Sequence, residues 1–499
     1  MALKKLLVKL LVFVTAVFII SAPASADMLP GYEGGIMDDM KYREMIFITG
    51  QPVLLEGSVK VTPGRMRDGK RQDRITYNLS SSDGSVKLSR SITISVTLQR
   101  EKGKDQVRTT YEIVRASETV TVKRDRTTER FTLENYSFTA SSVSDISAAV
   151  DYTTTVIRGR KVYDFNGGKG TVEVDISGKG VGYSSAWGST ETREVKLVIS
   201  SNRKADEKNG TQASSWTGTV DEELSSSRTV EISYVENRPA LMSFDGAYAV
   251  TTREDSTVRY SYSLPRLDEN GLPTGKQNRG SELISLSATP RVEMGYIPEF
   301  YDMAGHWARQ DVGRLAALGI MKQEGNYFWP QIPAKRLEFV LAVGRLVDIN
   351  SRAERWRDSS EEEAAPAFED LSLSKEDASI VAALAEMGVV EGISPRRFSP
   401  NQNLTRAQVV TILVRALGLE KNVPRMYRLG FRDEGEIPAW AKDAVYVGSS
   451  IGLVRGDEAG YFRPDDPVTR AEAAALLNRF ITYLKDDLRR DFRDRVMDF

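Results

Sequence analysis

Three stretches of the sequence share one pattern and decide the fold of the C-terminal half: 328-FWPQIPAKRLE-338, 398-FSPNQNLTRAQ-408 and 462-FRPDDPVTRAE-472. Each stretch opens with Phe-x-Pro, and an arginine follows the phenylalanine after eight residues every time. The stretches start 70 and 64 residues apart. Because chance does not hold such a spacing three times, the pattern indicates an internal repeat.

Two further anchor points recur in the same order around these stretches. A Phe-x-Asp motif opens each repeat, at Phe300/Asp302, Phe368/Asp370 and Phe431/Asp433. A glycine followed by an aliphatic residue ends a helical segment, at Gly319, Gly388 and Gly452. Apolar residues at helical spacing over 308–318, 406–417 and 470–483 then predict two helices per repeat, joined by a loop that contains the proline.

Capping boxes explain part of the helix-opening motif. In 405-TRAQ-408 and 469-TRAE-472 the threonine hydroxyl is expected to accept from the N–H three residues on, while Gln or Glu reaches back. Helix propensity does not explain the arginine, because Lys, Glu or Ala would serve as well there. An arginine beside the unpaired N–H groups of a helix start suits a carboxylate. We therefore predict anion binding at Arg336, Arg406 and Arg470 in preference to a plain solvated surface.

The order of these motifs, with His306-Trp307-Ala308 in the first copy, resembles the S-layer homology (SLH) repeat. Three copies are expected, over 298–355, 366–420 and 429–484. The resemblance implies an all-α, pseudo-threefold module. It also implies that grooves between the repeats bind a secondary cell-wall polysaccharide, typically through a pyruvylated sugar whose ketal carries a carboxylate.

The resemblance also implies which residues contact the polysaccharide. The set comprises the three arginines, Asp302, Asp370 and Asp433 as acceptors, the aromatic residues Trp307 and Trp440, and Thr405, Thr469 and Glu472. The two tryptophans suit either a sugar face or packing between helices. The first copy departs from the pattern because Lys335 and Leu337 break its capping box, so Arg406 and Arg470 are the preferred working sites. His306 is expected to be structural.

The preceding region, 27–297, has a different period. Ile92, Ile94, Val96 and Leu98 alternate with polar residues, and turn signals such as Asp83-Gly84 and 166-NGG-168 separate similar segments. Such alternation predicts an antiparallel, sandwich-like all-β region, as one large sheet pair or two sandwiches in tandem. Trp187 and Trp216 lie among small residues, where they could stack on sugars. We favour packing for both.

The composition excludes much of enzymology. The 499 residues include one histidine and no cysteine, which excludes disulfides, thiolate catalysis and cysteine-based metal sites, so we expect no metal and no cofactor. A balance of 68 basic against 69 acidic residues excludes a chain-wide field for nucleic acid. The segment 1–26 has basic, apolar and Ala-x-Ala parts typical of an export signal, and no later stretch is apolar enough to span a membrane.

Two interpretations of the whole chain follow. In the preferred one, an exported bacterial protein attaches to the cell wall through the repeats and presents a non-catalytic β region, in a surface layer or an adhesive role with possible self-association. In the alternative, the β region binds or cleaves glycans with carboxylates. The charged segment 485–499 is expected to continue the last helix as a solvated end.

Overall fold

The structure of the chain is a computed structural model that describes residues 34–38, 41–101, 105–124, 127–205, 212–236, 246–268, 272–356, 368–421 and 423–497. The predicted export signal, 1–26, lies outside the described residues. Strands occupy the N-terminal region and helices the C-terminal region, as the two sequence periods predict. Within the described ranges, no helix has both the length and the apolar character that a membrane crossing needs.

The strands run antiparallel and follow one another along the chain. Their bounds are β1 Gly35–Met37, β2 Tyr42–Ile46, β3 Val53–Thr62, β4 Lys70–Ser80, β5 Val86–Glu101, β6 Gln106–Lys123, β7 Thr128–Ile146, β8 Val150–Phe165, β9 Gly170–Ser185, β10 Gly188–Arg203, β11 Ser214–Val235, β12 Ala247–Leu267, β13 Pro273–Ser287 and β14 Arg291–Tyr296. The turn signals at Asp83-Gly84 and 166-NGG-168 do connect neighbouring strands, β4 to β5 and β8 to β9.

The antiparallel all-β prediction is confirmed, but the sandwich-like arrangement is wrong. The described strands form one sheet in the order β1 to β13, with β14 also paired to β12. From β1 to β13 each connection joins hydrogen-bonded neighbours, so no described strand crosses to a second sheet. Alternation reveals that one face is buried; it cannot tell whether the facing layer is another sheet or the same sheet curled back.

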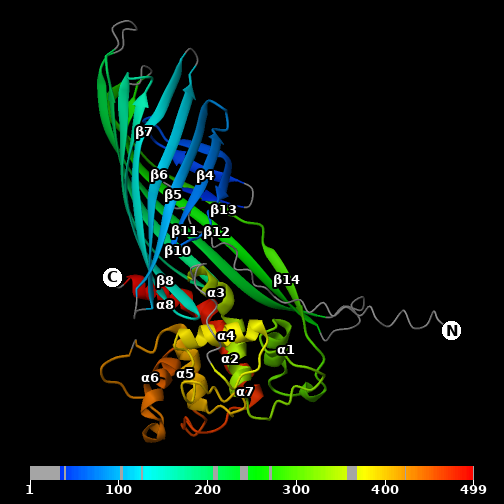
Figure 1. The fold of residues 1–499 in the computed structure, drawn as a ribbon. Helices are drawn as coiled ribbons and strands as arrows, with labels where there is room; N and C mark the ends of the chain where they lie inside the picture. The colour runs from blue at the N-terminus through cyan, green and yellow to red at the C-terminus, as the bar shows by residue number, and fades with distance from the viewer. Residues whose placement is uncertain are drawn as a thin grey trace, which may run out of the picture.

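The sheet curls until its first strands cover its last ones (Figure 1). Phe47, just after β2, packs against the rings of Tyr260 and Tyr262 on β12, with ring centroids 5.7 and 5.8 Å apart. The N–H of Met45 donates to the Tyr260 hydroxyl at 3.3 Å. The inward side chains of all these strands therefore form one apolar core inside a nearly closed sheet.

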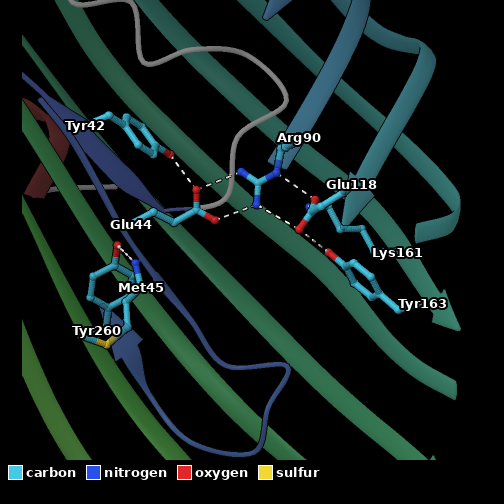
Figure 2. A network of polar contacts seen from close by, with 8 residues as sticks. All are labelled: Tyr42, Glu44, Met45, Arg90, Glu118, Lys161, Tyr163 and Tyr260. Carbon is cyan, nitrogen blue, oxygen red and sulfur yellow. Dashed lines mark hydrogen bonds and ion pairs between the residues drawn. The ribbon is translucent and has the colours of Figure 1, made fainter. Parts of the chain in front are cut away.

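A network of charged residues is buried inside this core (Figure 2). Arg90 on β5 donates to Glu44 at 2.8 and 2.9 Å and to Glu118 at 2.8 Å. Lys161 on β8 also donates to Glu118 at 2.8 Å, and Tyr163 donates to its other oxygen at 3.0 Å. The four charged side chains are each about 2% exposed, so the two cations and two anions neutralise one another away from water.

The helical region lies at one end of the sheet (Figure 1). Its helices are α1 Arg309–Ala317, α2 Arg336–Leu346, α3 Ile349–Trp356, α4 Lys375–Glu386, α5 Arg406–Leu417, α6 Ala439–Ser450, α7 Arg470–Thr482 and α8 Leu488–Met497. Short 3₁₀ turns at Tyr301–Met303 and Glu434–Glu436 precede α1 and α6, and a π-helical turn at Tyr483–Asp487 joins α7 to α8.

Two buried residues join the sheet to the helices. Trp187, in the turn from β9 to β10, is 1% exposed and donates through Nε1 to the carbonyl of Leu346 at 2.9 Å. Arg352 on α3 pairs with Asp151 on β8 at 2.5 Å and donates to the carbonyls of Ser147 and Ser184. The core of the helical region therefore continues into the end of the sheet. The packing interpretation of Trp187 is confirmed, and so is that of Trp216, which is 6% exposed in the core of the sheet.

The C-terminal segment continues the last helix as predicted, but it is not a solvated end. Leu488 is buried, and the ring of Phe492 lies 6.1 Å from Tyr152 and 5.2 Å from Tyr183 between ring centroids. Residues four apart share one face of a helix, so Leu488 and Phe492 form an apolar stripe. That stripe meets Tyr152 near the start of β8 and Tyr183 near the end of β9.

Replacing Trp187 by alanine should uncouple the sheet from the helices. The change removes a buried ring and its hydrogen bond, so we expect a loss of about 3–5 kcal/mol and two separate thermal transitions in calorimetry where the parent chain has one. Arg100→Ala is the control, because its exposed ion pair with Glu386 crosses the same junction and should contribute less than about 1 kcal/mol. A single unshifted transition for Trp187→Ala would contradict this role.

Glu118 makes the sheet sensitive to acid. Burial raises the pKa of this carboxyl, but the Arg90 and Lys161 charges outweigh that effect and lower the pKa to about 2. Because an unfolded glutamate has a pKa of about 4.3, the stabilisation is present above that pH and is lost as pH falls towards about 2.

Glu118→Gln should therefore lower the free energy of unfolding at neutral pH by about 3–5 kcal/mol, because it leaves the two buried cations of the network with only one carboxylate, Glu44, between them. It should also flatten the dependence of stability on pH below about 4. Urea denaturation across a pH series measures both effects. An acid limb that is equally steep in the variant and the parent chain would be inconsistent with this assignment.

Candidate functional site

The three repeats close around a ring of backbone hydrogen bonds. Ala334 donates to the carbonyl of Val468 at 2.8 Å, Val468 to Leu404 at 3.0 Å, and Leu404 back to Ala334 at 3.1 Å. Each of these buried residues lies two positions before the helix-opening arginine of its repeat. The ring therefore places the starts of α2, α5 and α7 around one axis, and the predicted pseudo-threefold arrangement is confirmed.

Each helix start is capped by a different repeat. The N–H groups of Arg336, Arg406 and Arg470 donate at 2.9–3.0 Å to the carbonyls of Gln402, Asp466 and Ile332, respectively. The next N–H of each helix donates to the proline carbonyl of the neighbouring Phe-x-Pro motif, at Pro400, Pro464 and Pro330. The prediction that these N–H groups are unpaired and available to bind a carboxylate is therefore wrong. A single sequence repeat cannot reveal that its neighbour supplies the acceptors.

The arginine side chains lie in the same interfaces. Each guanidinium group lies over a phenylalanine ring, and the distance from its central carbon to the ring centroid is 4.6–5.4 Å. The pairs are Arg336 with Phe398 (4.8 Å), Arg406 with Phe462 (5.4 Å) and Arg470 with Phe328 (4.6 Å). Each arginine thus stands on the phenylalanine of another repeat's Phe-x-Pro motif, and the third repeat closes onto the first. We call these three interfaces the arginine grooves.

One nitrogen of each guanidinium is engaged within the protein. Nη2 of Arg336 donates to the carbonyl of Glu391, and Nη2 of Arg406 donates to that of Arg455 at 2.6 Å. Nη2 of Arg470 donates to Gln323 at 2.6 Å and forms an ion pair with Glu338 at 2.8 Å. Among the described residues, Nη1 of the three arginines has no hydrogen-bond partner. Each groove therefore offers a positioned cation with Nη1 as an unused donor, while Nε of each arginine is buried.

Burial shifts the pKa values of the charged side chains in the grooves. It lowers the pKa of all three arginines, although guanidinium groups stay protonated at neutral pH. Burial also raises the pKa of Glu338 beside Arg470. A partly buried guanidinium backed by an aromatic ring is well suited to hold a carboxylate, because each charge is screened less there than at an open surface.

The three aspartates of Phe-x-Asp shape the loops beside the arginines. Asp302 accepts the N–H groups of Phe328 and Trp329 at 2.8 and 2.6 Å, and Asp370 and Asp433 make the equivalent pairs of contacts in their repeats. The middle residue of each Phe-x-Pro motif has a positive φ of 57–60°, which these paired hydrogen bonds hold in place. The carboxylates therefore serve the fold first, and their contact with a ligand stays a prediction.

The capping boxes are formed as predicted. Thr405 pairs with Gln408, and Thr469 pairs with Glu472, through hydrogen bonds in both directions. Lys335 gives no side-chain cap, also as predicted, and its amine donates to Asn403 at 2.7 Å instead. Arg336 nevertheless occupies the same position over a phenylalanine as the other two arginines. The broken box therefore does not distort the first groove.

Trp307 and Trp440 are exposed at 62% and 50%, so packing between helices does not explain them. Among the described residues, neither ring lies under one of the three arginines. His306 accepts the N–H of Ala308 at 3.1 Å and pairs with Gln331 at 3.0 Å, which fits the expected structural role.

The sequence reasoning missed an exposed aromatic cluster in the first repeat. Tyr301, Tyr327 and Trp329 are 47–55% exposed and contact one another. They occupy the variable positions around Phe300 and Phe328, where only the number of aromatic residues in this one copy could have indicated them. Elsewhere in the described ranges, no group of three or more His, Asp or Glu side chains is arranged to hold a metal ion.

Asp433→Asn should loosen the third repeat. An asparagine accepts one of the two N–H groups but turns its own NH₂ towards the other, so we expect a loss of about 1–2 kcal/mol in urea denaturation followed by helical circular dichroism. Asp465→Asn is the matched control, because this aspartate is exposed in the following loop and should change stability by less than about 0.5 kcal/mol. Equal stability of the two variants would speak against the proposed role of Asp433.

Comparison with known proteins agrees with this geometry. The family model described as "S-layer homology domain" matches residues 299–340, 367–410 and 430–474. The chain is 24% identical to exoglucanase XynX of Acetivibrio thermocellus over 46% of the chain and 21% of that relative. It is 26% identical to the surface-layer 125 kDa protein of Lysinibacillus sphaericus, over 41% of the chain and 17% of the relative.

A third relative, S-layer protein EA1 of Bacillus anthracis, is 26% identical over 35% of the chain and 19% of its own length. The chain thus matches only about a fifth of the length of these relatives. The matches cover mainly the S-layer homology regions, which surface-layer proteins and glycoside hydrolases share. The chain therefore carries three C-terminal S-layer homology domains, which indicate anchoring to the cell wall, and it is a cell-surface protein.

Proposed function

We propose that the three domains attach the chain to the wall non-covalently by binding a secondary cell-wall polysaccharide in the arginine grooves. The observation that carries the proposal is the repetition of one arrangement at all three interfaces. In each, an arginine lies on a phenylalanine of another repeat, and its Nη1 has no hydrogen-bond partner among the described residues. Helix packing alone does not require a guanidinium there, since an aliphatic side chain would cover the ring as well.

The chemistry of the groove favours a sugar that carries a carboxylate, such as a pyruvate ketal. An arginine presents parallel N–H donors that match the two oxygens of a carboxylate. The phenylalanine ring restricts the orientation of the guanidinium group. This lowers the conformational entropy that the side chain loses on binding. The aspartates, threonines and Glu472 set the shape of each groove, while Trp307 and Trp440 offer exposed faces to neighbouring sugars.

For the curled sheet we propose a non-catalytic role as the part of the protein presented at the surface, with self-association in a surface layer as its extension. The charge network supports this role, because Arg90 pairs with both of its buried carboxyl groups, Glu44 and Glu118. An acid catalyst for glycoside cleavage needs a protonated carboxyl, which two neighbouring cations disfavour at Glu118.

Sedimentation with purified bacterial sacculi tests the anchoring. The parent protein should pellet with sacculi that retain their polysaccharide and stay in solution with sacculi stripped of it. The double variant Arg406→Ala, Arg470→Ala should lose most of this binding, because each arginine removed takes away a charge-assisted contact worth about 1.5–3 kcal/mol.

The matched control is the double variant Arg396→Ala, Arg490→Ala, which removes the same charge from exposed positions outside the grooves. It should pellet like the parent protein. If both double variants pellet equally well, or if the parent protein ignores the polysaccharide, the proposed binding site is wrong. Circular dichroism of each variant verifies that loss of binding does not reflect loss of fold.

A further inference from the structure

We propose that the cluster of Tyr301, Tyr327 and Trp329, here called the aromatic tip, binds an uncharged pyranose ring by stacking, beside the Arg470 groove. The inference rests on the proposed function and assigns a second kind of sugar contact to one of the three grooves. Neither the repeat motif nor the family match singles out these three residues, because Tyr301 and Trp329 lie at the variable positions of Phe-x-Asp and Phe-x-Pro and Tyr327 precedes the second motif.

The aromatic tip is exposed and yet well ordered. Tyr301 contacts Tyr327 edge to face at 5.6 Å between ring centroids, and Tyr327 stacks on Trp329 at 5.3 Å. Asp302 fixes the backbone beneath the cluster through the N–H groups of Phe328 and Trp329. A rigid aromatic face loses little conformational entropy on binding, and it suits the C–H surface of a sugar ring.

Trp329 itself is in an unusual conformation. Its φ is 59°, a region that bulky side chains rarely adopt and that costs on the order of 1 kcal/mol or more. The equivalent residues Ser399 and Arg463 have the same φ, so the loop imposes the conformation and does not require a tryptophan. The large exposed ring at this position therefore has no explanation in the fold of the loop.

The three repeats present different chemistry on the same backbone. Where the first has the aromatic tip, the second has Glu369, Arg397 and Ser399, and the third has Arg432, Tyr461 and Arg463. In the third repeat both arginines lie over the Tyr461 ring, at 6.0 and 5.8 Å, and Arg463 also pairs with Asp457 at 2.7 Å, so that surface carries charged groups. Only the first repeat offers an extended apolar surface among these equivalent positions.

The position of the aromatic tip links it to the Arg470 groove. Phe328, the residue between Tyr327 and Trp329, carries the guanidinium of Arg470 at 4.6 Å. Glu338 lies 2.8 Å from Arg470 and offsets its charge. Arg406 lies instead over Phe462, next to the charged surface of the third repeat. The first repeat thus places an apolar surface suited to an uncharged ring beside the Arg470 groove, whereas the third repeat places charged side chains beside the Arg406 groove.

Hydrogen-bonding groups flank the stacking surface. Gln331 belongs to the turn that the N–H of Ile332 closes onto the carbonyl of Trp329 at 3.3 Å. Its amide pairs with the His306 ring at 3.0 Å. Sugar sites combine an aromatic face with a few fixed polar groups in this way, because the ring hydroxyls lie at the edge of the stacked face.

Residues taken from the second repeat provide the test variant. Tyr327→Arg with Trp329→Ser gives the first repeat the side chains that Arg397 and Ser399 already carry on the same backbone, so the fold should tolerate them. The matched control, Tyr461→Arg with Arg463→Ser, places the same side chains at the equivalent positions of the third repeat. Both are made in the full chain.

The probes are the polysaccharide released from purified sacculi and the same polymer after chemical reduction of its carboxyl groups, titrated by calorimetry. The parent protein should bind both. The first-repeat variant should bind the reduced polymer about tenfold more weakly, as expected for the loss of stacked rings, while the third-repeat control should keep its affinity for it. Arg406→Ala should weaken binding of the native polymer and leave the reduced one unaffected.

The outcomes separate this inference from the anchoring proposal. If the parent protein binds the native polymer but not the reduced one, stacking of an uncharged ring is wrong and anchoring stands. If it binds neither polymer, both proposals fail. If the first-repeat variant matches the parent protein, or if the control loses as much affinity, the aromatic tip is not the binding surface.

Discussion

The structure of the helical region depends on one constraint: each repeat must supply the carbonyl groups that cap the second helix of the repeat before it, and the first repeat must cap the third. The ring through Ala334, Leu404 and Val468 closes only when three repeats are present. A helix start without acceptors would leave buried N–H groups unpaired, at a cost of about 1–3 kcal/mol each. The same exchange brings every arginine onto another repeat's phenylalanine, so the grooves are products of the closure and not of any single repeat.

The curled sheet also depends on contacts between strands that are far apart in the sequence, which here bury its inward face. A long meander buries its inward face by curling onto itself, and the cation Arg90 lies at an inward position between Leu88 and Ile92. Two carboxylates and the neighbouring Lys161 make that position tolerable. Trp187 and Arg352 then fix the end of the sheet onto the helices. Whatever the sheet presents is therefore held rigidly relative to the grooves.

The sequence allowed the helical region to be predicted in some detail, because its signals are local. The capping boxes, the glycine stops and the constant offset of eight residues from each Phe-x-Pro phenylalanine to its arginine all act within one repeat. What could not be predicted depends on residues far apart in the chain, such as Pro330 capping the helix that starts at Arg470. The aspartates illustrate the point, since they recur like ligand contacts but hold a strained turn about thirty residues away.

The curling of the sheet as a single layer could not be predicted for the same reason, because it depends on contacts between distant residues. Alternation identified the buried face, and it placed Ile92 and Ile94 correctly. It gave no information on curvature, which depends on contacts such as that between Phe47 and Tyr260. Trp187 was correctly expected to pack, but its partner Leu346 lies in the other region of the chain. Pairings at such distance in sequence leave no local pattern.

The central claim is that ligand binds where one repeat meets another. Hydrogen–deuterium exchange of the full chain, with and without released wall polysaccharide, tests this claim most directly. The account predicts added protection in 328–338, 398–408 and 462–472, the segments that form the grooves, and unchanged exchange in β5 to β10 away from the junction. Protection confined to the sheet, or none anywhere, would contradict it.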